Sequence, residues 1–313
     1  MIDKLEMFIA LANERHFGRA AAAHGVTQPT LSAAIRALEG ELGVQLVARG
    51  ARFQGLTPEG ERVLDWARRI VTDSRQMRDE MRARRKGLGG VLRLGVIPTA
   101  LPMVADLAAP FLARHPNVRL QVLSRTSVEI LAEMEALQLD AGITYLDNEP
   151  LGRVSSVALY TERYRLLVHS THPLAGAGGV GWAALDGLQL ALLVDSMQNR
   201  RIIDQRLARA GVRVQAMLES NSLLALVGQV LAGGWVTVVT DEAAALFAGR
   251  ADLVALPITD TPGRPDQSGG GEAALPAYQV GLVAPWRETH TPLLAALLQE
   301  AGRLARRRHR RDA

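Results

Sequence analysis

The first sixty residues alternate apolar and polar positions at the spacing of α-helices. A run of alanines ends near Gly25, which can adopt the positive φ that a sharp turn between two helices needs. Thr27 then offers an N-cap oxygen, and Pro29 falls in the first helical turn, where its missing N–H costs nothing. The apolar residues of the second helix recur on one face, at Leu31, Ile35, Leu38 and Leu42. This pattern predicts a helix-turn-helix whose second helix leaves other side chains free, among them Gln28, Thr30, Ser32, Ala33 and Arg36.

A longer helical pattern follows over residues 58–86, with Thr57 as its N-cap. Apolar and small residues alternate at intervals of four and three, at Val63, Ala67, Ile70, Ser74, Met77 and Met81. That spacing is typical of a coiled-coil seam, and the remaining faces are largely charged. We therefore predict a dimerisation helix. A core helix buried on one side remains the alternative, because Ser74 interrupts the seam.

After the glycine-rich segment 87–90 the pattern changes to alternating strands and helices. We predict strands at 91–97, 118–123, 140–145, near 163–169, 188–194, 213–218 and 235–240, and at 277–284, with helices between them and at 291–308. This βαβ order predicts a mostly parallel sheet in each of two α/β subdomains. Residues 258–276 are too rich in glycine and proline to pack and are expected to form a surface insertion.

The segment between the two N-terminal helical patterns carries positive charge around a glycine. Arg49 and Arg52 flank Gly50, and Thr57 opens the next helix. Such a loop can lie along phosphates as a wing. Helix pairs with a glycine turn also occur in proteins that never meet nucleic acid, so this loop favours DNA binding over simple packing.

Taken together, residues 1–60 resemble the winged helix-turn-helix of LysR-type transcriptional regulators. The resemblance rests on Ala20-Ala21, Val26-Thr-Gln-Pro29, Leu31-Ser32, Ile35-Arg-Ala-Leu-Glu39, Leu42-Gly43 and Leu56-Thr-Pro-Glu-Gly60. It implies DNA contacts at Gln28, Pro29, Thr30, Ser32, Arg36, Arg49, Arg52 and Thr57. Many members carry an arginine directly after the serine, where this chain has Ala33, so a guanine contact is not expected there.

The same resemblance implies an architecture for the whole chain. It comprises a winged helix-turn-helix at 1–58, a linker and dimerisation helix at 59–86, a hinge at 87–90 and an effector-binding domain at 91–313. That domain would be periplasmic-binding-protein-like, with two Rossmann-like subdomains at about 91–161 with 277–308 and at about 162–257.

An effector would then bind between the subdomains, at strand ends where helix N-termini present free amides. The residues expected there are Thr99, Ala100, Thr126, Ser127, Tyr145, Gln198, Asn199 and Ser220. Simple N-caps are the alternative interpretation of Thr99 and Thr126. Amides and hydroxyls from two lobes suit a polar or anionic metabolite. Met197–Ile203 and Ile143–Gly152 are similar to a subgroup associated with formate metabolism, which makes formate one option. Where family members often place a proline after the 235–239 strand, this chain has Thr240.

Composition narrows the classes of function. The 313 residues include no cysteine, which excludes disulfides, thiolate metal sites and thiol catalysis. The charged N-terminus and the absence of a long apolar run predict a cytoplasmic protein without a membrane segment. The net charge is +4, with a basic N-terminal part and an acidic body. The arginine-rich tail 303–311 is expected to be a solvated helix end rather than a phosphate-binding segment.

Two other functions were weighed against DNA binding. Gly176–Gly181 matches the glycine pattern of NAD(P)-binding enzymes, but only a short helix can follow it, so a dinucleotide site is not favoured. A solute-binding protein would need a signal peptide. No catalytic residue, metal site or other cofactor is predicted. The expected partners are double-stranded promoter DNA, a second copy of the chain in a dimer or a dimer of dimers, and RNA polymerase if the protein is an activator.

Overall fold

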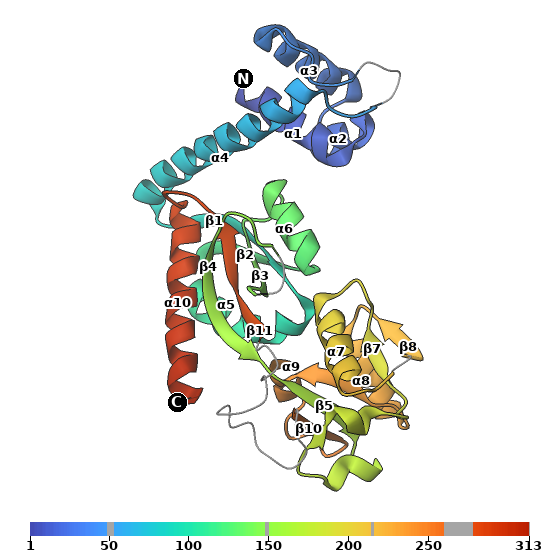
Figure 1. The fold of residues 1–313 in the computed structure, drawn as a ribbon. Helices are drawn as coiled ribbons and strands as arrows, with labels where there is room; N and C mark the ends of the chain where they lie inside the picture. The colour runs from blue at the N-terminus through green and yellow to red at the C-terminus, as the bar shows by residue number, and fades with distance from the viewer. Residues whose placement is uncertain (49–52, 148–149, 214–215, 260–277, 313) are drawn as a thin grey trace.

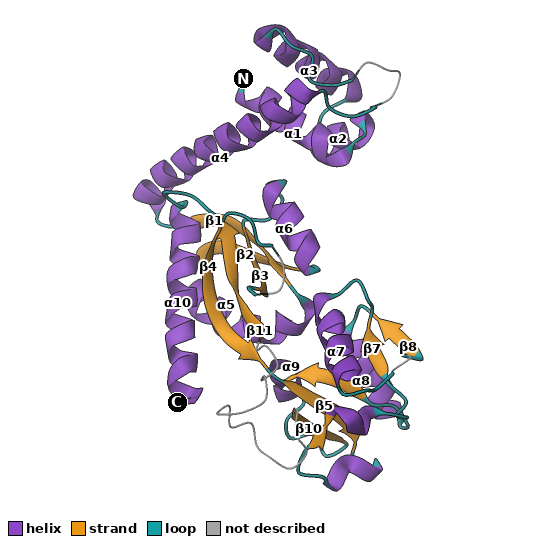
Figure 2. Ribbon diagram, viewed as in Figure 1, coloured by secondary structure: helices purple, strands orange, loops and turns teal. Residues whose placement is uncertain are grey.

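A computed structural model describes residues 1–48, 53–147, 150–213, 216–259 and 278–312. The chain forms a helical N-terminal part, a long linking helix and two α/β lobes (Figure 1). Coloured by secondary structure, the strands lie only in the two lobes (Figure 2). The Arg49 and Arg52 wing positions and nearly all of the expected glycine-rich insertion fall outside the described residues.

The N-terminal part packs three helices around one apolar core. These are α1 (Ile2–Glu14), α2 (Phe17–Ala23) and α3 (Gln28–Leu42). Gly25 has a φ of 70° in the α2–α3 turn, as the sequence predicts. Leu31, Ile35 and Leu38 are buried, as predicted. Leu42 was predicted on the same face but is exposed. The helix-turn-helix therefore presents its N-terminal end to solvent.

The linking helix α4 (Pro58–Lys86) spans the predicted range, but its faces differ from the predicted seam. Leu64, Ala67 and Val71 are buried and belong to the core of the N-terminal helices. Ala67 and the partly buried Val63 therefore face the chain's own domain, where the sequence analysis placed them on a dimer seam. An exposed apolar stripe remains on α4, comprising Trp66, Ile70, Met77 and Met81.

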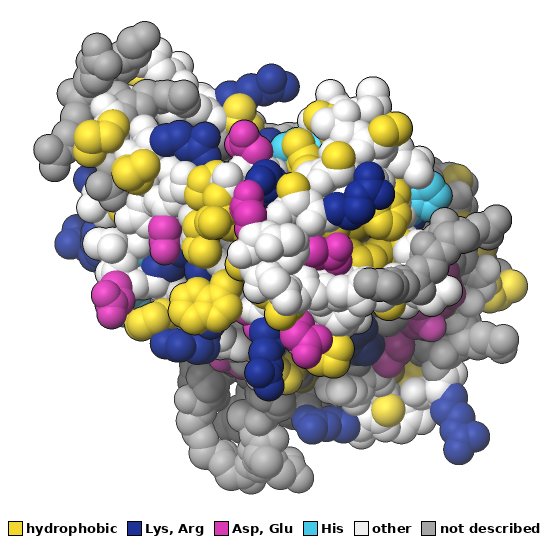
Figure 3. Space-filling view, turned by 90° about the horizontal axis from the view of Figure 1, so that it is seen from above, with side chains coloured by type: hydrophobic (Ala, Val, Ile, Leu, Met, Phe, Trp, Pro, Cys, Tyr) yellow, Lys and Arg dark blue, Asp and Glu magenta, His cyan; other side chains and the backbone are white. Residues whose placement is uncertain are grey.

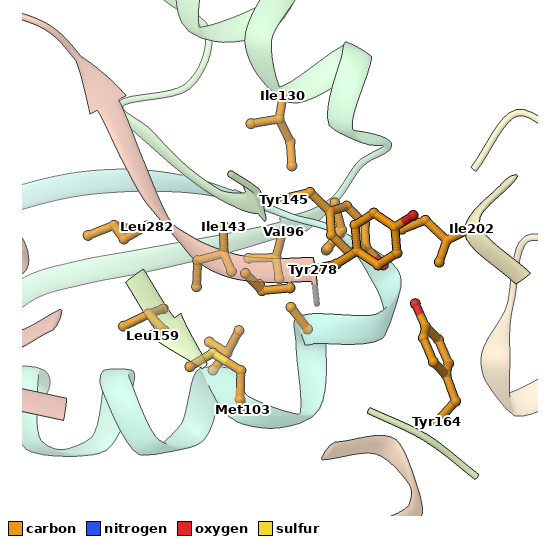
Figure 4. Close-up of a cluster of buried hydrophobic side chains, with 14 of the residues drawn as sticks. Val96, Met103, Ile130, Ile143, Tyr145, Leu159, Tyr164, Ile202, Tyr278 and Leu282 are labelled. Atoms are coloured by element: carbon orange, nitrogen blue, oxygen red, sulfur yellow. The ribbon is translucent and has the colours of Figure 1, made fainter. Parts of the chain in front are cut away.

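The first lobe is built on a sheet with the strand order β2-β1-β3-β11-β4. Its strands are β1 (Gly89–Val96), β2 (Asn117–Ser124), β3 (Ala141–Tyr145), β4 (Val154–Glu162) and β11 (Tyr278–Pro285). β1 pairs parallel with β2 and β3, whereas β11 runs antiparallel to both of its neighbours. The helices are α5 (Val104–Arg114), α6 (Ser127–Glu135) and α10 (Pro292–Asp312), and a 3-10 turn covers Pro98–Met103. Ile130 and Met103 pack on opposite faces of this sheet (Figure 4).

The second lobe has a smaller sheet in the order β6-β10-β5-β9, with β7 and β8 paired beside it. The strands are β5 (Tyr164–His169), β6 (Val180–Gly181), β7 (Ala191–Leu193), β8 (Leu218–Ser220), β9 (Thr237–Thr240) and β10 (Leu253–Thr259). The helices are α7 (Gln198–Arg209), α8 (Leu223–Ala232) and α9 (Asp241–Ala245).

Several strand predictions were wrong in detail. β4 and β10 were not predicted, and Ile258 and Thr259, expected to begin an insertion, end β10 and pair with Val180 and Gly181. β5 runs antiparallel to β9 and β10, and β11 runs antiparallel to β3 and β4, so both sheets are mixed rather than mostly parallel. The physical reason is that half-exposed strands such as β4 mix polar and apolar residues and lack the continuous apolar run of a buried parallel strand.

The glycine loop at 176–181 forms no dinucleotide site. Pro173–Gly176 is a 3-10 turn, Val180 and Gly181 form β6, and only a 3-10 turn over Trp182–Leu185 follows. The loop therefore lacks the directly following α-helix whose N-terminus binds the pyrophosphate in dinucleotide-binding folds.

Candidate functional site

The start of α3 carries the side chains predicted to contact DNA bases. The Thr27 hydroxyl caps the helix by accepting a hydrogen bond from the Thr30 amide at 3.4 Å. Gln28, Pro29, Thr30 and Arg36 are exposed, and Ser32 is partly exposed. The fold therefore brings these five predicted contacts to one accessible helix, anchored from behind by its buried face.

The base of the predicted wing is fixed by backbone contacts. Val47 and Leu56 form an antiparallel bridge, and the Ala48 amide donates to the Gly55 carbonyl at 3.0 Å. The Glu39 carboxylate accepts hydrogen bonds from the Leu46 and Val47 amides at 2.9 and 3.2 Å, which ties α3 to the wing.

Thr57 is already engaged in capping α4. Its hydroxyl donates to the Gln45 carbonyl at 2.5 Å and accepts from the Gly60 amide at 2.9 Å. A DNA contact by Thr57 stays a prediction. Seen from the end of the molecule that carries α1–α3, basic, acidic and hydrophobic side chains are interspersed (Figure 3).

The second group of predicted residues meets where the two lobes join, around a buried carboxylate. Glu162 ends β4, and its Oε2 accepts hydrogen bonds from the hydroxyls of Tyr145 and Tyr164, each at 2.7 Å. Asn199 Nδ2 lies 3.3 Å from the Tyr145 hydroxyl and 3.4 Å from Glu162 Oε2. Tyr164 points its hydroxyl toward Tyr145 from the second lobe (Figure 4). We call Tyr145, Glu162, Tyr164 and Asn199 the inter-lobe cluster.

Burial dominates the electrostatics of this cluster. It raises the pKa of Glu162, and hydrogen bonds from Tyr164 and Tyr145 offset part of that rise. The Thr99 hydroxyl also favours the ionised carboxyl, although no hydrogen bond between them has the usual geometry. Burial and the nearby Glu162 likewise raise the pKa of Tyr145 well above its usual value. The cluster is thus a set of polar groups withdrawn from water.

Two predicted hydroxyls nearby have no partner. Thr99 Oγ1 and Ser127 Oγ are buried and make no hydrogen bond. They follow β1 and β2 at the same edge of the sheet, where Val96 is in register with Ser124. Buried hydroxyls normally find partners, so Ser127 is open to a ligand, whereas Thr99 already favours the ionised forms of Glu162 and Tyr145.

The other residues predicted to bind an effector are buried or already hydrogen-bonded within the fold. Ala100 is fully buried. Thr126 closes a capping box with Glu129, so its hydroxyl serves the helix, as the N-cap alternative proposed. The Gln198 side-chain oxygen accepts from Arg201, and Ser220 Oγ accepts from the Ser222 amide at 3.1 Å. Met197 gives α7 no side-chain cap.

Sequence reasoning missed Glu162 and Tyr164. Both lie where β4 passes into β5, and a charged residue in a strand has no local signal of burial. Thr240, noted in place of a family proline, caps α9 through its hydroxyl and the Ala243 amide.

A separate groove lies between α4 and the first lobe. It has a volume of about 660 Å³, and the lining includes Asp73, Met77, Arg153, Trp286 and Arg287. It is remote from the inter-lobe cluster and contains none of the residues predicted to bind an effector.

Among the described residues, no group of three or more His, Asp or Glu side chains could hold a metal ion. Within the same residues, no helix is long and apolar enough to span a membrane.

Comparison with known families matches nearly the whole chain. Residues 2–61 match the family described as "Bacterial regulatory helix-turn-helix protein, lysR family", and residues 85–306 match "LysR substrate binding domain". A probable hydrogen peroxide-inducible genes activator of Mycobacterium avium is 35% identical over 80% of this chain and 81% of its own length. The DNA-binding transcriptional dual regulator OxyR of Escherichia coli is 32% identical over 82% and 84%.

Solved structures show the same fold. Full-length OxyR of Pseudomonas aeruginosa, with a cysteine replaced by aspartate, gives a TM-score of 0.72 at 24% identity, covering 98% of this chain and 94% of its own. CbnR in complex with its target DNA gives 0.60 at 22% identity, covering 97% and 100%. The predicted fold class, a winged helix-turn-helix followed by a two-lobed effector domain, is thereby confirmed.

Proposed function

The chain belongs to the LysR family of bacterial regulatory proteins, and we propose that a small molecule held at the inter-lobe cluster controls how it binds promoter DNA. As a member of that family it is a DNA-binding transcriptional regulator and not an enzyme. The NAD(P)-dependent alternative finds no support in either the glycine loop or the relatives.

One observation carries the effector site. Three side chains, from β3, β5 and α7, converge on the buried carboxylate of Glu162 at the end of β4, and the buried Ser127 hydroxyl has no hydrogen-bond partner. Because each lobe contributes to this cluster, a ligand that contacts it binds the closed arrangement of the lobes more tightly than the open one. Such a difference in affinity is what a ligand needs in order to shift a conformational equilibrium.

The effector is a polar metabolite rather than an oxidant of thiols. Relatives are named hydrogen peroxide-inducible genes activators, but this chain contains no cysteine, so sensing through a thiol is closed to it. No relative supports formate, which stays one anionic option among polar metabolites.

Self-association would place two reading helices on one operator. The exposed stripe of Trp66, Ile70, Met77 and Met81 on α4 supports a dimer through this helix, and a dimer of dimers would use further surfaces. If the protein activates transcription, bound RNA polymerase is its further partner.

A titration of DNA binding tests the proposal. Fluorescence anisotropy with the protein's own upstream region should give a steep negative dependence of log affinity on log salt. Gln28→Ala should relax sequence preference, whereas Arg52→Gln should weaken all duplexes alike. Equal affinity for random duplex in the wild type, with and without metabolites, would overturn the regulator function.

The effector site has its own readout in the same assay. A polar metabolite that changes wild-type affinity for the operator should lose that effect in Asn199→Ala, while binding without metabolite stays intact. An unchanged metabolite response in this variant would remove the inter-lobe cluster as the effector site.

A further inference from the structure

Building on the proposed effector site, we propose that the molecule bound between the lobes presents a positively charged nitrogen, an ammonium or amidinium group, to Glu162. The proposal starts from an imbalance within this carboxylate. Oε2 receives hydrogen bonds from Tyr145, Tyr164 and Asn199, whereas Oε1 is buried and receives none.

The donors that surround Glu162 are all neutral. Two are phenol hydroxyls and the third is a carboxamide, so the hydrogen bonds supply dipoles but no opposite charge. The guanidinium of Arg206 lies over the Tyr164 ring, 5.5 Å from its centre. A carboxylate withdrawn from water without a cation is costly, because desolvation is compensated only in part.

A second buried glutamate in the same chain shows the usual solution. Glu300 on α10 is as deeply buried as Glu162, yet its carboxylate pairs with Arg114, Arg303 at 3.1 Å and Arg307 at 3.6 Å. The fold thus surrounds one buried glutamate with guanidinium groups and the other with neutral donors. A ligand nitrogen would give Glu162 the cation that the fold gives Glu300.

The site also explains why a simple anion fits poorly. An anion placed beside Glu162 would face a like charge in a medium that screens it weakly. A molecule with both charges avoids this conflict, since Ser127 and the uncapped N-terminus of α7 can receive its polar or anionic end. Amino-acid-like molecules therefore suit the site better than plain carboxylates.

Matched probes test this inference on the full-length protein. Thermal unfolding and calorimetric titration are run with L-alanine and L-leucine, and with the corresponding acids that lack the α-amino group. The wild type should prefer the amine-bearing member of a pair by at least tenfold in affinity. Glu162→Gln keeps the size and an acceptor oxygen but removes the charge, so it should reduce that preference to less than twofold.

Glu300→Gln is the matched control, because it also neutralises a buried glutamate but lies on the outer helix α10. It should lower stability while leaving the preference between the paired probes unchanged. If Glu162→Gln fails to fold, the wild-type preference alone decides the matter.

The outcomes separate this inference from the proposed function. Binding of the deaminated acids as tightly as the amino acids, or an undiminished preference in Glu162→Gln, overturns the cationic group while the effector site stands. If neither the amino acids nor the deaminated acids bind the wild type, the proposal of a cationic nitrogen at Glu162 is overturned. If, in addition, no metabolite alters DNA binding, the effector-controlled function fails as well.

Discussion

The two functional regions of this molecule are built on opposite principles. At the start of α3, the predicted DNA-contacting side chains are exposed or partly exposed and come from consecutive turns of one helix, and the hydrogen bond between Thr27 and Thr30 is local to that helix start. At the lobe junction, the polar groups are buried, come from separate strands and helices, and bond to each other. A surface that binds a large rigid partner can be encoded by residues close together in the sequence. A site that encloses a small molecule brings together residues that lie far apart in the sequence.

That contrast explains what could be predicted. The helix-turn-helix followed from Gly25, Thr27 and a helical apolar period, because each signal acts within a few residues. Thr99, Ser127, Tyr145 and Asn199 were placed only through a family resemblance. Glu162 was missed because its role depends on pairing between β4 and β11 and on contact between lobes, which no local pattern encodes.

The same limit affected the long helix. The 29 residues of α4 were predicted with their correct ends, since N-cap and length signals are local. Which face is buried depends on where α1 packs, so Leu64 and Val71 rather than Ile70 fill the core.

The largest expected effect tests the N-terminal helix-turn-helix domain. A Cβ added at Gly60 would lie 2.1 Å from the Leu46 carbonyl oxygen, a backbone atom that cannot rotate away. Gly60→Ala should therefore destabilise the N-terminal domain by about 3 kcal/mol, the upper range for overpacking. Urea unfolding followed by circular dichroism measures the change.

Gly40→Ala is the control, because a Cβ there, in the last turn of α3, meets nothing within 4 Å. Ala should stabilise that helix by about 0.5–1 kcal/mol through its higher helix propensity. If Gly40→Ala loses as much stability as Gly60→Ala, the close approach of Gly60 to the Leu46 carbonyl is not the cause. The domain would then be sensitive to any added methyl group.

The second prediction tests the inter-lobe cluster. Glu162→Ala removes the acceptor shared by Tyr145 and Tyr164 and leaves both hydroxyls buried without a partner. The lost hydrogen bonds outweigh the relief of burying a carboxylate, so the effector domain should lose about 2 kcal/mol. Glu162→Gln retains an acceptor and should lose less than half as much in the same unfolding assay. Equal losses would mean that an amide of the same size cannot replace the carboxylate, and would contradict a role limited to one acceptor oxygen.

The third prediction uses the dependence of stability on pH. Burial raises the pKa of Glu162 in the folded chain above its usual value of 4.5, so the folded state binds this proton more tightly than the unfolded state does. The favourable contribution is complete below pH 4.5 and is lost as the pH rises through the folded-state pKa, by about 1.4 kcal/mol per unit of elevation.

Glu162→Gln has no such proton. The free energy of unfolding of wild type minus that of Glu162→Gln should therefore fall as the pH is raised from 4 toward neutrality. The N-terminal surface offers no counterpart, since none of its predicted contacts is an acidic residue. A difference that stays flat with pH would place Glu162 in a more hydrated environment than the structure shows.

The smallest effect concerns α4, which, among its described side chains, forms one ion pair with α1 and one with the first lobe. Arg75 reaches back to Glu6 on α1 at 3.0 Å, and Asp73 accepts from Arg287 of the first lobe at 3.2 Å. Exposed pairs contribute about 0–1 kcal/mol, so neither Glu6→Gln nor Asp73→Asn should measurably change the unfolding midpoint. Only the second pair, however, joins the sensing lobes to the helix that carries the reading domain. Asp73→Asn should therefore alter the effector-dependent change in operator affinity by about twofold, and Glu6→Gln should not, because the coupling between two sites depends on contacts that differ between the two arrangements. If both variants change the response equally, the ion pair at Asp73 is not the specific link. The inter-lobe cluster would then be coupled to the helix-turn-helix through α4 as a rigid helix, without dependence on any single contact.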